Sequence, residues 1–276
     1  MQYFEIHLKD QFPFLGENGC DPMLTLYLPD NLKEMGREND LRPTILICPG
    51  GAYVGIAKRE SEPIALQFLT KGYNVVVLRY SCSPNRFPTQ MCQVAATMEL
   101  IHRNSALWHC DPNRIAIMGF SAGGHLAAHY STCFDCAEVR EVFPDSKPVQ
   151  ASILCYPVIT AYPPYRHFGS IRNVSGLEEL TEADMRKFSP EANVTDKTPP
   201  AFLWHTAGDE GVPVMNSLLY AQALAAHKIP FALHVYPHGS HGLATVDKLT
   251  NNKLDPKALY AAEWIDSLLK WLEITL

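Results

Sequence analysis

The sequence predicts an α/β fold in which helices cover both faces of a mostly parallel central sheet of about eight strands. Short apolar runs alternate with segments of helical periodicity along most of the 276 residues, and such alternation is typical of parallel βαβ units. The runs are too apolar for strands with a solvent-facing side, as expected of central strands. Hydrophobic residues make up 47% of the chain and charged residues 19%, a composition that can bury a large core.

Eight segments have the pattern of strands. The first two, YFEIHL and MLTLYLP, are separated by GENGCDP and predict an antiparallel pair at the N-terminal edge of the sheet. The other six are TILICP (44–49), YNVVVLRY (73–80), RIAIMGF (114–120), ASILCYP (151–157), AFLWHT (201–206) and FALHVY (231–236). Because helical segments separate most of these six, we expect them to be parallel.

Five longer segments have the periodicity of helices. They are residues 60–71, 88–107, 122–133, 214–227 and 256–273. Residues 157–200 break the alternation, since they are rich in proline, tyrosine and polar residues, and within them only LEELTEADMRKF has a helical pattern. This segment is too short to own a core. We therefore expect residues 1–276 to form a single domain, with 157–200 as an excursion over the active-site edge of the sheet.

Charge and composition disfavour several classes of function. The net charge is −6 and there is no cluster of Lys and Arg, so the electrostatic footprint of a nucleic-acid binder is absent. The N-terminus MQYFEIHLKD lacks a secretory pattern, and no segment approaches 18 uninterrupted apolar residues. We therefore expect a cytoplasmic protein with a small-molecule substrate and neither nucleic acid nor membrane as a partner. A homodimer stays open.

The eight cysteines lack the dense, regular spacing of a disulfide framework. We expect them to be small core residues in a reducing compartment. Cys133 and Cys136 form a CxxC late in a predicted helix, but a zinc ribbon would need a second such pair. No metal site is therefore predicted.

The stretch RIAIMGFSAGGHLAA (114–128) sets one serine between two glycines where a predicted strand passes into a helix. Ser121 at such a turn can point its hydroxyl into a cleft, and Gly119 and Gly123 let strand and helix approach without a Cβ clash. Small residues also suit an ordinary turn in which the serine caps the helix. The position between an apolar strand and a helix favours a nucleophile.

A nucleophilic serine needs a base, and the base needs an acid that holds its tautomer. Asp209 follows the predicted strand 201–206, and His241 follows the strand 231–236. Both residues therefore belong to loops at the carboxyl ends of strands, the edge at which Ser121 also lies. The chain order serine, aspartate, histidine is that of α/β-hydrolases.

Each of these two partners has a rival. Glu210 is the alternative acid, but the pattern D-x-x-V-P lets the valine and proline start the next helix while the carboxylate of Asp209 stays at the turn. His238 is the alternative base, but Pro237 ties it to the end of the strand, whereas His241 lies on a freer loop. We therefore assign Asp209 and His241 to the triad.

The oxyanion that develops during acyl transfer needs fixed N–H donors. We expect one to be the amide of Ala122, directly after the nucleophile. The loop in TILICPGGAYVG supplies the others, because Gly50 and Gly51 let backbone amides face inward, and we assign the amides of Gly51 and Ala52. A phosphate loop is the alternative for such a turn, but the spacings GxxxxGK[ST] and GxGxxG are missing.

With these motifs the sequence resembles the α/β-hydrolase superfamily, in particular the esterase/lipase branch similar to bacterial acetyl esterases and acetylxylan esterase-like proteins. The resemblance rests on PGGAY (49–53), GYNVVVLRYS (72–81), GFSAGGHLAA (119–128), SPEANVTDKTPPAFLWHTAGDEGVPV (189–214) and GSHG (239–242). It implies the α/β-hydrolase fold and hydrolysis of carboxylic esters through an acyl-serine, with no metal and no cofactor.

The chain departs from lipase-like members of this branch at two points. Many of them carry HGGG where this sequence has Pro49-Gly50-Gly51-Ala52, so the histidine that props the oxyanion loop is absent. PGG-type members share this feature, and the resemblance therefore points towards the carbohydrate-esterase-like branch. We also expect no counterpart of the large N-terminal cap. Residues 157–200 are then left to shape the acyl pocket, which predicts a short acyl group such as acetyl.

Three further side chains lie near the predicted site. Tyr53 and Tyr80 fall at the same edge of the sheet, and we expect them to line the substrate site, with simple packing as the alternative. His125, one helical turn beyond Ser121, is expected to be a core residue rather than the base. Two other functions stay open: a serine peptidase of the prolyl-oligopeptidase type, and a non-catalytic small-ligand-binding protein on the same fold.

Overall fold

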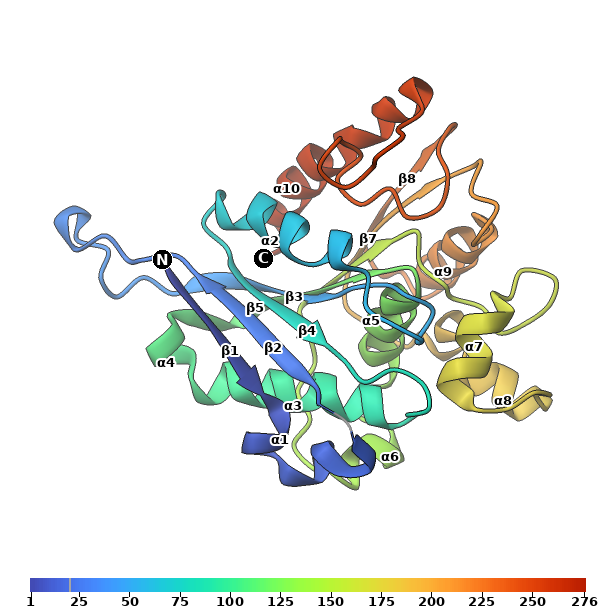
Figure 1. The fold of residues 1–276 in the computed structure, drawn as a ribbon, viewed down its shortest axis with the longest axis horizontal. Helices are drawn as coiled ribbons and strands as arrows, with labels where there is room; N and C mark the ends of the chain where they lie inside the picture. The colour runs from blue at the N-terminus through green and yellow to red at the C-terminus, as the bar shows by residue number, and fades with distance from the viewer. Residues whose placement is uncertain (20) are drawn as a thin grey trace.

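A computed structural model describes residues 1–19 and 21–276. Eight strands form one sheet in the order β1-β2-β4-β3-β5-β6-β7-β8 (Figure 1). They are β1 (Gln2–His7), β2 (Met23–Leu28), β3 (Arg42–Cys48), β4 (Asn74–Arg79), β5 (Cys110–Phe120), β6 (Ala151–Cys155), β7 (Ala201–Thr206) and β8 (Phe231–Tyr236). The predicted fold class is confirmed, since every one of these strands falls on a segment that the apolar pattern predicts.

Strand directions also follow the prediction. β1 and β2 are antiparallel, with Gln2 opposite Leu28, and β2 is antiparallel to β4. The remaining pairs in the sheet, which join β4, β3, β5, β6, β7 and β8 in that order, are all parallel. The carboxyl ends of β3, β5, β7 and β8 therefore meet at one edge of the sheet, and the loops that follow these strands are brought together there.

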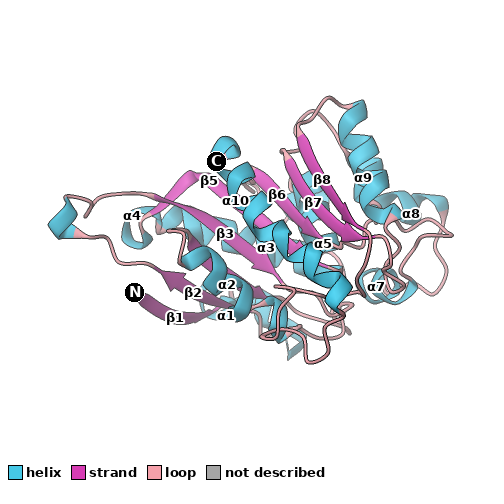
Figure 2. Cartoon of the chain, turned by 90° about the horizontal axis from the view of Figure 1, so that it is seen from above, coloured by secondary structure: helices cyan, strands magenta, loops and turns pink. Residues whose placement is uncertain are grey.

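The helices cover both faces of this sheet (Figure 2). The α-helices are α1 (Leu8–Gln11), α2 (Glu62–Leu69), α3 (Thr89–Arg103), α4 (Ser105–Trp108), α5 (Ala122–Cys133), α6 (Ala137–Arg140), α7 (Phe168–Ser175), α8 (Glu182–Lys187), α9 (Met215–Ala226) and α10 (Trp264–Thr275). Short 3-10 helices are η1 (Pro13–Gly19), η2 (Lys33–Met35), η3 (Lys58–Glu60), η4 (Pro190–Asn193) and η5 (Pro256–Glu263).

Two of the predicted helices differ from the observed ones. The predicted helix 88–107 is interrupted at Asn104, whose side-chain amide donates to the carbonyl of Leu100 at 2.8 Å. Such a local bond competes with helix continuation. The predicted helix 256–273 begins as the 3-10 helix η5, which has proline at its first position. The prediction for 122–133 agrees with α5 at both ends.

Alternate residues of each central strand face two separate cores. In β3, Leu46 and Cys48 belong to the core shared with α3, α5 and α9, whereas Ile45 and Ile47 belong to the core shared with α2 and α10. All four side chains are fully buried. Strands buried on both faces lack polar alternation, which explains the continuous apolar runs in the sequence.

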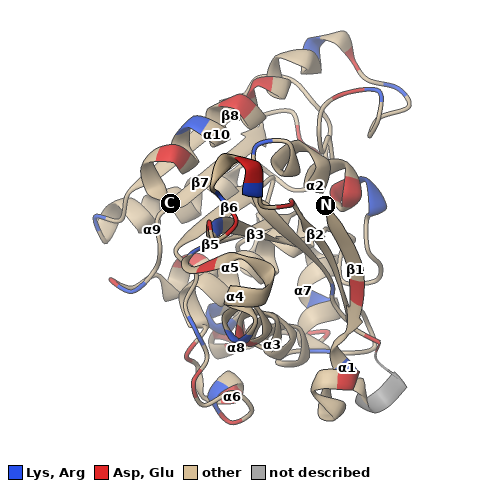
Figure 3. Ribbon diagram, turned by 90° about the vertical axis from the view of Figure 1, so that its left-hand side faces the viewer, with Lys and Arg blue, Asp and Glu red and all other residues tan. Residues whose placement is uncertain are grey.

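Charged residues are dispersed over the fold. Figure 3 shows Lys and Arg intermixed with Asp and Glu on helices and loops, with neither sign gathered on a single element. Within residues 1–19 and 21–276, no helix combines the length and apolar character that a bilayer crossing requires.

Residues 157–200 carry α7, α8 and η4 and pack over α5. The imidazole Nε2 of His125 lies 3.0 Å from the carbonyl oxygen of Phe188, and the ring of His129 stacks on Phe87 with centroids 5.5 Å apart. Burial lowers the pKa of His125 to about 4 and that of His129 to about 3. Both rings are therefore neutral in the folded protein at neutral pH, and His125 has the core role expected for it.

Replacing His129 with phenylalanine is expected to reduce the acid sensitivity of the fold. An unfolded histidine has a pKa of about 6.5, so below this pH the unfolded chain binds a proton that the folded protein excludes, and the free energy of unfolding falls. His129→Phe should make this fall shallower by up to about 1.4 kcal/mol per pH unit. Urea unfolding at several pH values measures it, with the exposed His238→Gln as control. A slope equal to that of the wild type would mean that the folded protein accommodates a protonated His129.

Candidate active site

Ser121 occupies a sharp turn between β5 and α5. Its backbone has φ 53° and ψ −119°, a conformation that costs a non-glycine residue about 1–3 kcal/mol. The flanking glycines explain how this turn fits. A Cβ added at Gly119 would meet the carbonyl of Gly123, and one added at Gly123 would meet the carbonyl of Cys48 at the end of β3. The two glycines therefore let α5 approach β3 and β5 closely.

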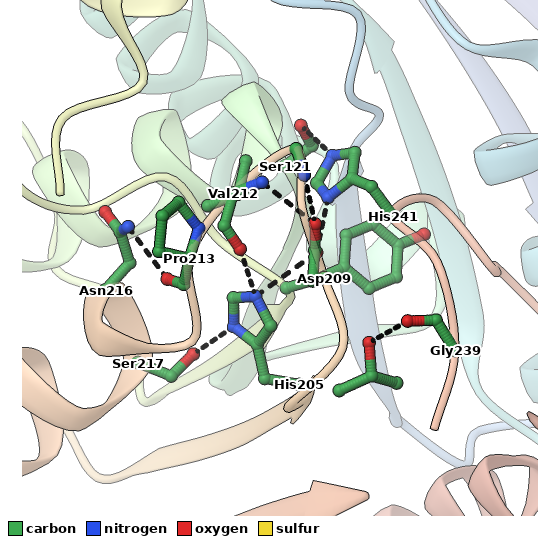
Figure 4. A network of polar contacts seen from close by, with 12 residues as sticks. Ser121, His205, Asp209, Val212, Pro213, Asn216, Ser217, Gly239 and His241 are labelled. Atoms are coloured by element: carbon green, nitrogen blue, oxygen red, sulfur yellow. Dashed lines mark hydrogen bonds and ion pairs between the residues drawn. The ribbon is translucent and has the colours of Figure 1, made fainter. Parts of the chain in front are cut away.

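The structure brings Ser121, His241 and Asp209 into one hydrogen-bonded line (Figure 4). His241 Nε2 lies 2.8 Å from Ser121 Oγ, and His241 Nδ1 lies 2.7 Å from Asp209 Oδ2. Because a carboxylate oxygen accepts, Nδ1 carries the ring proton and Nε2 accepts from the serine hydroxyl. This is the tautomer that a general base needs.

The carboxylate of Asp209 is held by donors on several sides. Oδ1 accepts from the amides of Gly211 and Val212, each at 2.9 Å. Oδ2 lies 3.3 Å from Nε2 of His205 as well as next to His241. Burial by itself raises the pKa of Asp209, but the hydrogen bonds from His205, His241 and Val212 outweigh this effect and hold the pKa well below its usual range. The group is ionised at neutral pH.

His205 lies in β7, four residues before Asp209. A role for this residue in the site was not predicted from the sequence. His205 is fully buried, with Nδ1 2.8 Å from Ser217 Oγ and Nε2 2.9 Å from the carbonyl of Val212. Since the carbonyl accepts, Nε2 is protonated and also points at Asp209. A histidine in an apolar strand gives no sign in the sequence of such a contact.

The two rival residues lie elsewhere. Glu210 and His238 are exposed. Both ring nitrogens of His241 are already occupied by Ser121 and Asp209, which leaves no position on the ring for Glu210. The geometry thus favours Asp209 and His241, the two residues that the sequence pattern also favours.

The loop after β3 has an unusual backbone. Gly51, Ala52 and Tyr53 all have positive φ values, 130°, 53° and 58°, and successive residues of this kind turn backbone amides towards one side. A Cβ added at Gly50 would lie 3.0 Å from Ser121 Cβ, so the loop borders Ser121. Within the described residues, no backbone carbonyl accepts from the amides of Gly51, Ala52 or Ala122.

The structure gives Tyr53 and Tyr80 a different place from the predicted one. Both side chains are buried, and their hydroxyls donate inside the protein, that of Tyr80 to the carbonyl of Pro49 at 2.7 Å and that of Tyr53 to Nδ1 of His125 at 2.9 Å. Through these bonds they pack inside the protein beneath the loop after β3, and their burial does not fit the expected role of lining a substrate site. The sheet edge was correctly identified, but the positive φ values of the loop turn Tyr53 inward. Asn173 of α7 adds a bond to the carbonyl of Ala52 at 2.8 Å.

A cleft of about 610 Å³ borders the histidine loop. Among the residues that line it are His241 itself and polar or charged side chains from three segments. They are Glu210, His238, Ser240, Lys253 and Asp255. The described residues contain no group of three or more His, Cys, Asp and Glu side chains placed to hold a metal ion.

Comparison with protein families gives one match, to the family described as BD-FAE, over residues 24–224. This region covers most of the chain. The chain belongs to the BD-FAE family. The expected resemblance to acetylxylan esterase-like α/β-hydrolases is confirmed as well. One relative of this BD-FAE chain is named an acetylxylan esterase, and one similar solved structure is that of an acetyl ester-xyloside bifunctional hydrolase.

Two curated relatives are longer proteins. The chain is 34% identical to endo-1,4-beta-xylanase B of Butyrivibrio fibrisolvens over 231 residues, 80% of this chain and 35% of that protein. It is 31% identical to an acetylxylan esterase of Xylanibacter ruminicola over 209 residues, 74% of this chain and 42% of that protein. The BD-FAE chain thus spans roughly a third to two-fifths of the length of these relatives.

A solved structure matches nearly end to end. The acetyl ester-xyloside bifunctional hydrolase from Caldicellulosiruptor lactoaceticus has a TM-score of 0.84 and 34% identity, covering 98% of this chain and 96% of that one. The fold of the BD-FAE chain is therefore that of this hydrolase. The chain is placed among ester hydrolases of the α/β-hydrolase fold.

Proposed function

We propose that the chain is a serine carboxylesterase that hydrolyses short-chain acyl esters, acetyl esters of carbohydrates above all, through an acyl-serine intermediate. The observation that carries this proposal is the continuous hydrogen-bonded line from Ser121 through His241 to Asp209. It lies beside a loop whose amides lack backbone acceptors in the described part of the chain. A buried acid, a base in the required tautomer and free amides next to one serine are the parts of an acyl-transfer site.

Acylation begins when Ser121 Oγ attacks the carbonyl carbon of the ester and its proton passes to His241 Nε2. The carbonyl oxygen becomes an oxyanion, to which the amides of Ala122, Gly51 and Ala52 donate. Asp209 stabilises the imidazolium that has formed. The bond to the alcohol oxygen then breaks as His241 gives this oxygen its proton, which leaves the acyl group on Ser121.

Deacylation repeats these steps with water as the nucleophile. His241 takes a proton from the water, whose oxygen attacks the acyl carbon, and the same amides stabilise the second oxyanion. When the intermediate breaks down, Ser121 Oγ leaves with the proton from His241 and the carboxylic acid is released. The cycle consumes one water and needs no cofactor.

The alcohol part of the substrate is proposed to be hydrophilic. Polar and charged side chains make up part of the lining of the cleft beside His241, together with apolar ones, and the polar groups can bind hydroxyl groups of the alcohol. The names of the relatives agree with this proposal, since one is an acetylxylan esterase and another an acetyl ester-xyloside hydrolase. The acetyl preference is inferred from the shortness of residues 157–200, the segment that is expected to shape the acyl pocket.

Steady-state hydrolysis of p-nitrophenyl esters from acetate to decanoate tests this function. We expect kcat/KM to be highest for acetate and to fall steeply with chain length, as the proposed acetyl preference requires. Release of acetate from acetylated xylo-oligosaccharides is the second arm. Cleavage of an aminoacyl-proline amide with no ester turnover would indicate a peptidase, and turnover of neither class a binding protein.

A further inference from the structure

Glu60, the last residue of η3, is a buried carboxylate that the proposed triad does not use. Only 2% of the residue is exposed. Oε2 accepts from the amide of Gly50 at 2.7 Å, and Oε1 accepts from the hydroxyl of Tyr156 at 2.8 Å. Burial raises the pKa of Glu60, and the hydrogen bonds from Tyr156 and Gly50 counteract part of the rise. Acidic side chains are rarely buried to this extent, so a specific role needs to be found for Glu60.

On one side, Glu60 holds the start of the oxyanion loop. Its partner Gly50 directly precedes Gly51 and Ala52, whose amides are the proposed donors, and Gly50 is packed against Ser121. The carbonyl of Gly50 accepts from the amide of Ala57 at 2.9 Å, which closes the loop on itself. A carboxylate that fixes the Gly50 amide therefore limits how the next peptide units can rotate.

On the other side, Glu60 reaches the histidine loop through Tyr156. The hydroxyl of Tyr156 donates to Glu60 and accepts from the amide of Ala244 at 3.0 Å. Its ring meets the ring of His241 edge to face, with centroids 5.1 Å apart. Ala244 is fixed further by Trp264, whose indole donates to its carbonyl at 3.0 Å. The side chain of Tyr156 thus contacts His241, the proposed base, and its hydroxyl binds the segment that follows His241.

We propose that Glu60 and Tyr156 are positioning residues, which hold the oxyanion loop and the histidine loop in one fixed relation to Ser121. The proposal rests on the proposed function, since it concerns the same reaction. A single buried carboxylate and a single phenol connect the two loops that must act on one ester at the same moment. The carboxylate adds to the support that the loop receives from Tyr80 at Pro49 and from Asn173 at Ala52. A displacement of about 1 Å of such groups can cost about 100-fold in rate.

Two conservative substitutions separate the two halves of this link. Glu60→Gln keeps the shape but has one acceptor oxygen in place of two, so either the Gly50 amide or the Tyr156 hydroxyl loses the oxygen to which it donates. Tyr156→Phe removes the bonds to Glu60 and Ala244 and keeps the ring against His241. We expect each variant to lower kcat for p-nitrophenyl acetate by about 10- to 100-fold with KM nearly unchanged. Because both act through one link, the double variant should lose less than the product of the two single losses.

A merely structural role would give a different result. The matched control is Tyr130→Phe, which removes another buried phenol whose hydroxyl donates to a carbonyl, that of Lys147, away from the site. It should leave kcat unchanged. Affinity for a trifluoromethyl ketone, which forms a tetrahedral adduct with the serine, should fall in parallel with kcat/KM in the two test variants only.

The proposal is overturned if the wild type hydrolyses esters while Tyr156→Phe and Glu60→Gln keep kcat within about threefold of it, whatever happens to their melting temperatures. If Glu60→Gln does not fold, Tyr156→Phe decides by itself. A wild type that hydrolyses no ester contradicts the proposed function instead, and these two failures are told apart by the wild-type assay.

Discussion

Replacing Ser121 with alanine is expected to lower kcat for ester hydrolysis by about 10⁶-fold, the scale found when a triad serine is removed. In the proposed mechanism the hydroxyl oxygen is the atom that attacks, and no other hydroxyl is hydrogen bonded to His241 within the described residues. Alanine takes up the same backbone turn, so the free energy of unfolding should change by no more than about 1 kcal/mol. Steady-state kinetics with p-nitrophenyl acetate and urea unfolding of the same preparation measure both quantities.

Ser131→Ala provides the matched control. Ser131 lies on the same helix, α5, is buried, and donates to the carbonyl of Ala127 at 2.8 Å. Its loss removes a buried serine hydroxyl without touching the proposed reaction. Activity of Ser121→Ala above about a thousandth of the wild type, or an equal loss in Ser131→Ala, would show that Ser121 is not the nucleophile.

Much of the fold could be predicted because the central strands are buried on both faces. β7 illustrates this well: all six of its residues are buried, and its sequence AFLWHT shows no alternation of apolar and polar residues over its first four positions. β8 was predicted from the same apolar pattern, but it is the last strand of the sheet and Phe231 and Val235 are exposed, so the expected burial on both faces is wrong for this strand. The break at Asn104 depends on one side-chain bond, and a periodicity that continues through it cannot reveal it.

The relation of Ser121, Asp209 and His241 could be predicted because parallel topology brings the carboxyl ends of their strands to one edge. How deeply each side chain near that edge is buried could not be predicted. Glu60 follows Lys58 and Arg59 in the sequence and resembles a solvated charged turn. Its burial is decided by Tyr156, 96 residues away. The same holds for Tyr53, whose inward direction is set by a backbone turn that the letters GGAY do not specify.

Replacing Asp209 with asparagine is expected to lower kcat by about 10⁴-fold, because the histidine would be held in the wrong tautomer. The surroundings decide which way the new amide faces. The amides of Gly211 and Val212 both donate to Oδ1, so the asparagine oxygen must take that place and its NH₂ group must face Nδ1 of His241. Nδ1 then becomes an acceptor, the ring proton moves to Nε2, and Nε2 can no longer accept from Ser121.

Glu210→Gln separates the effect of the tautomer from that of charge. It removes one negative charge from the adjacent, exposed position and should leave kcat within about twofold, since an exposed charge is screened by water and salt. In Asp209→Asn the NH₂ group also faces the Nε2 hydrogen of His205, 3.3 Å from Oδ2 in the native protein, so two donors oppose each other and the melting temperature should fall as well. If Glu210→Gln loses more activity than Asp209→Asn, the acid has been misassigned. If Asp209→Asn keeps more than about a tenth of the wild-type kcat, His241 does not need the carboxylate of Asp209 to hold its tautomer, and the role assigned to Asp209 is wrong.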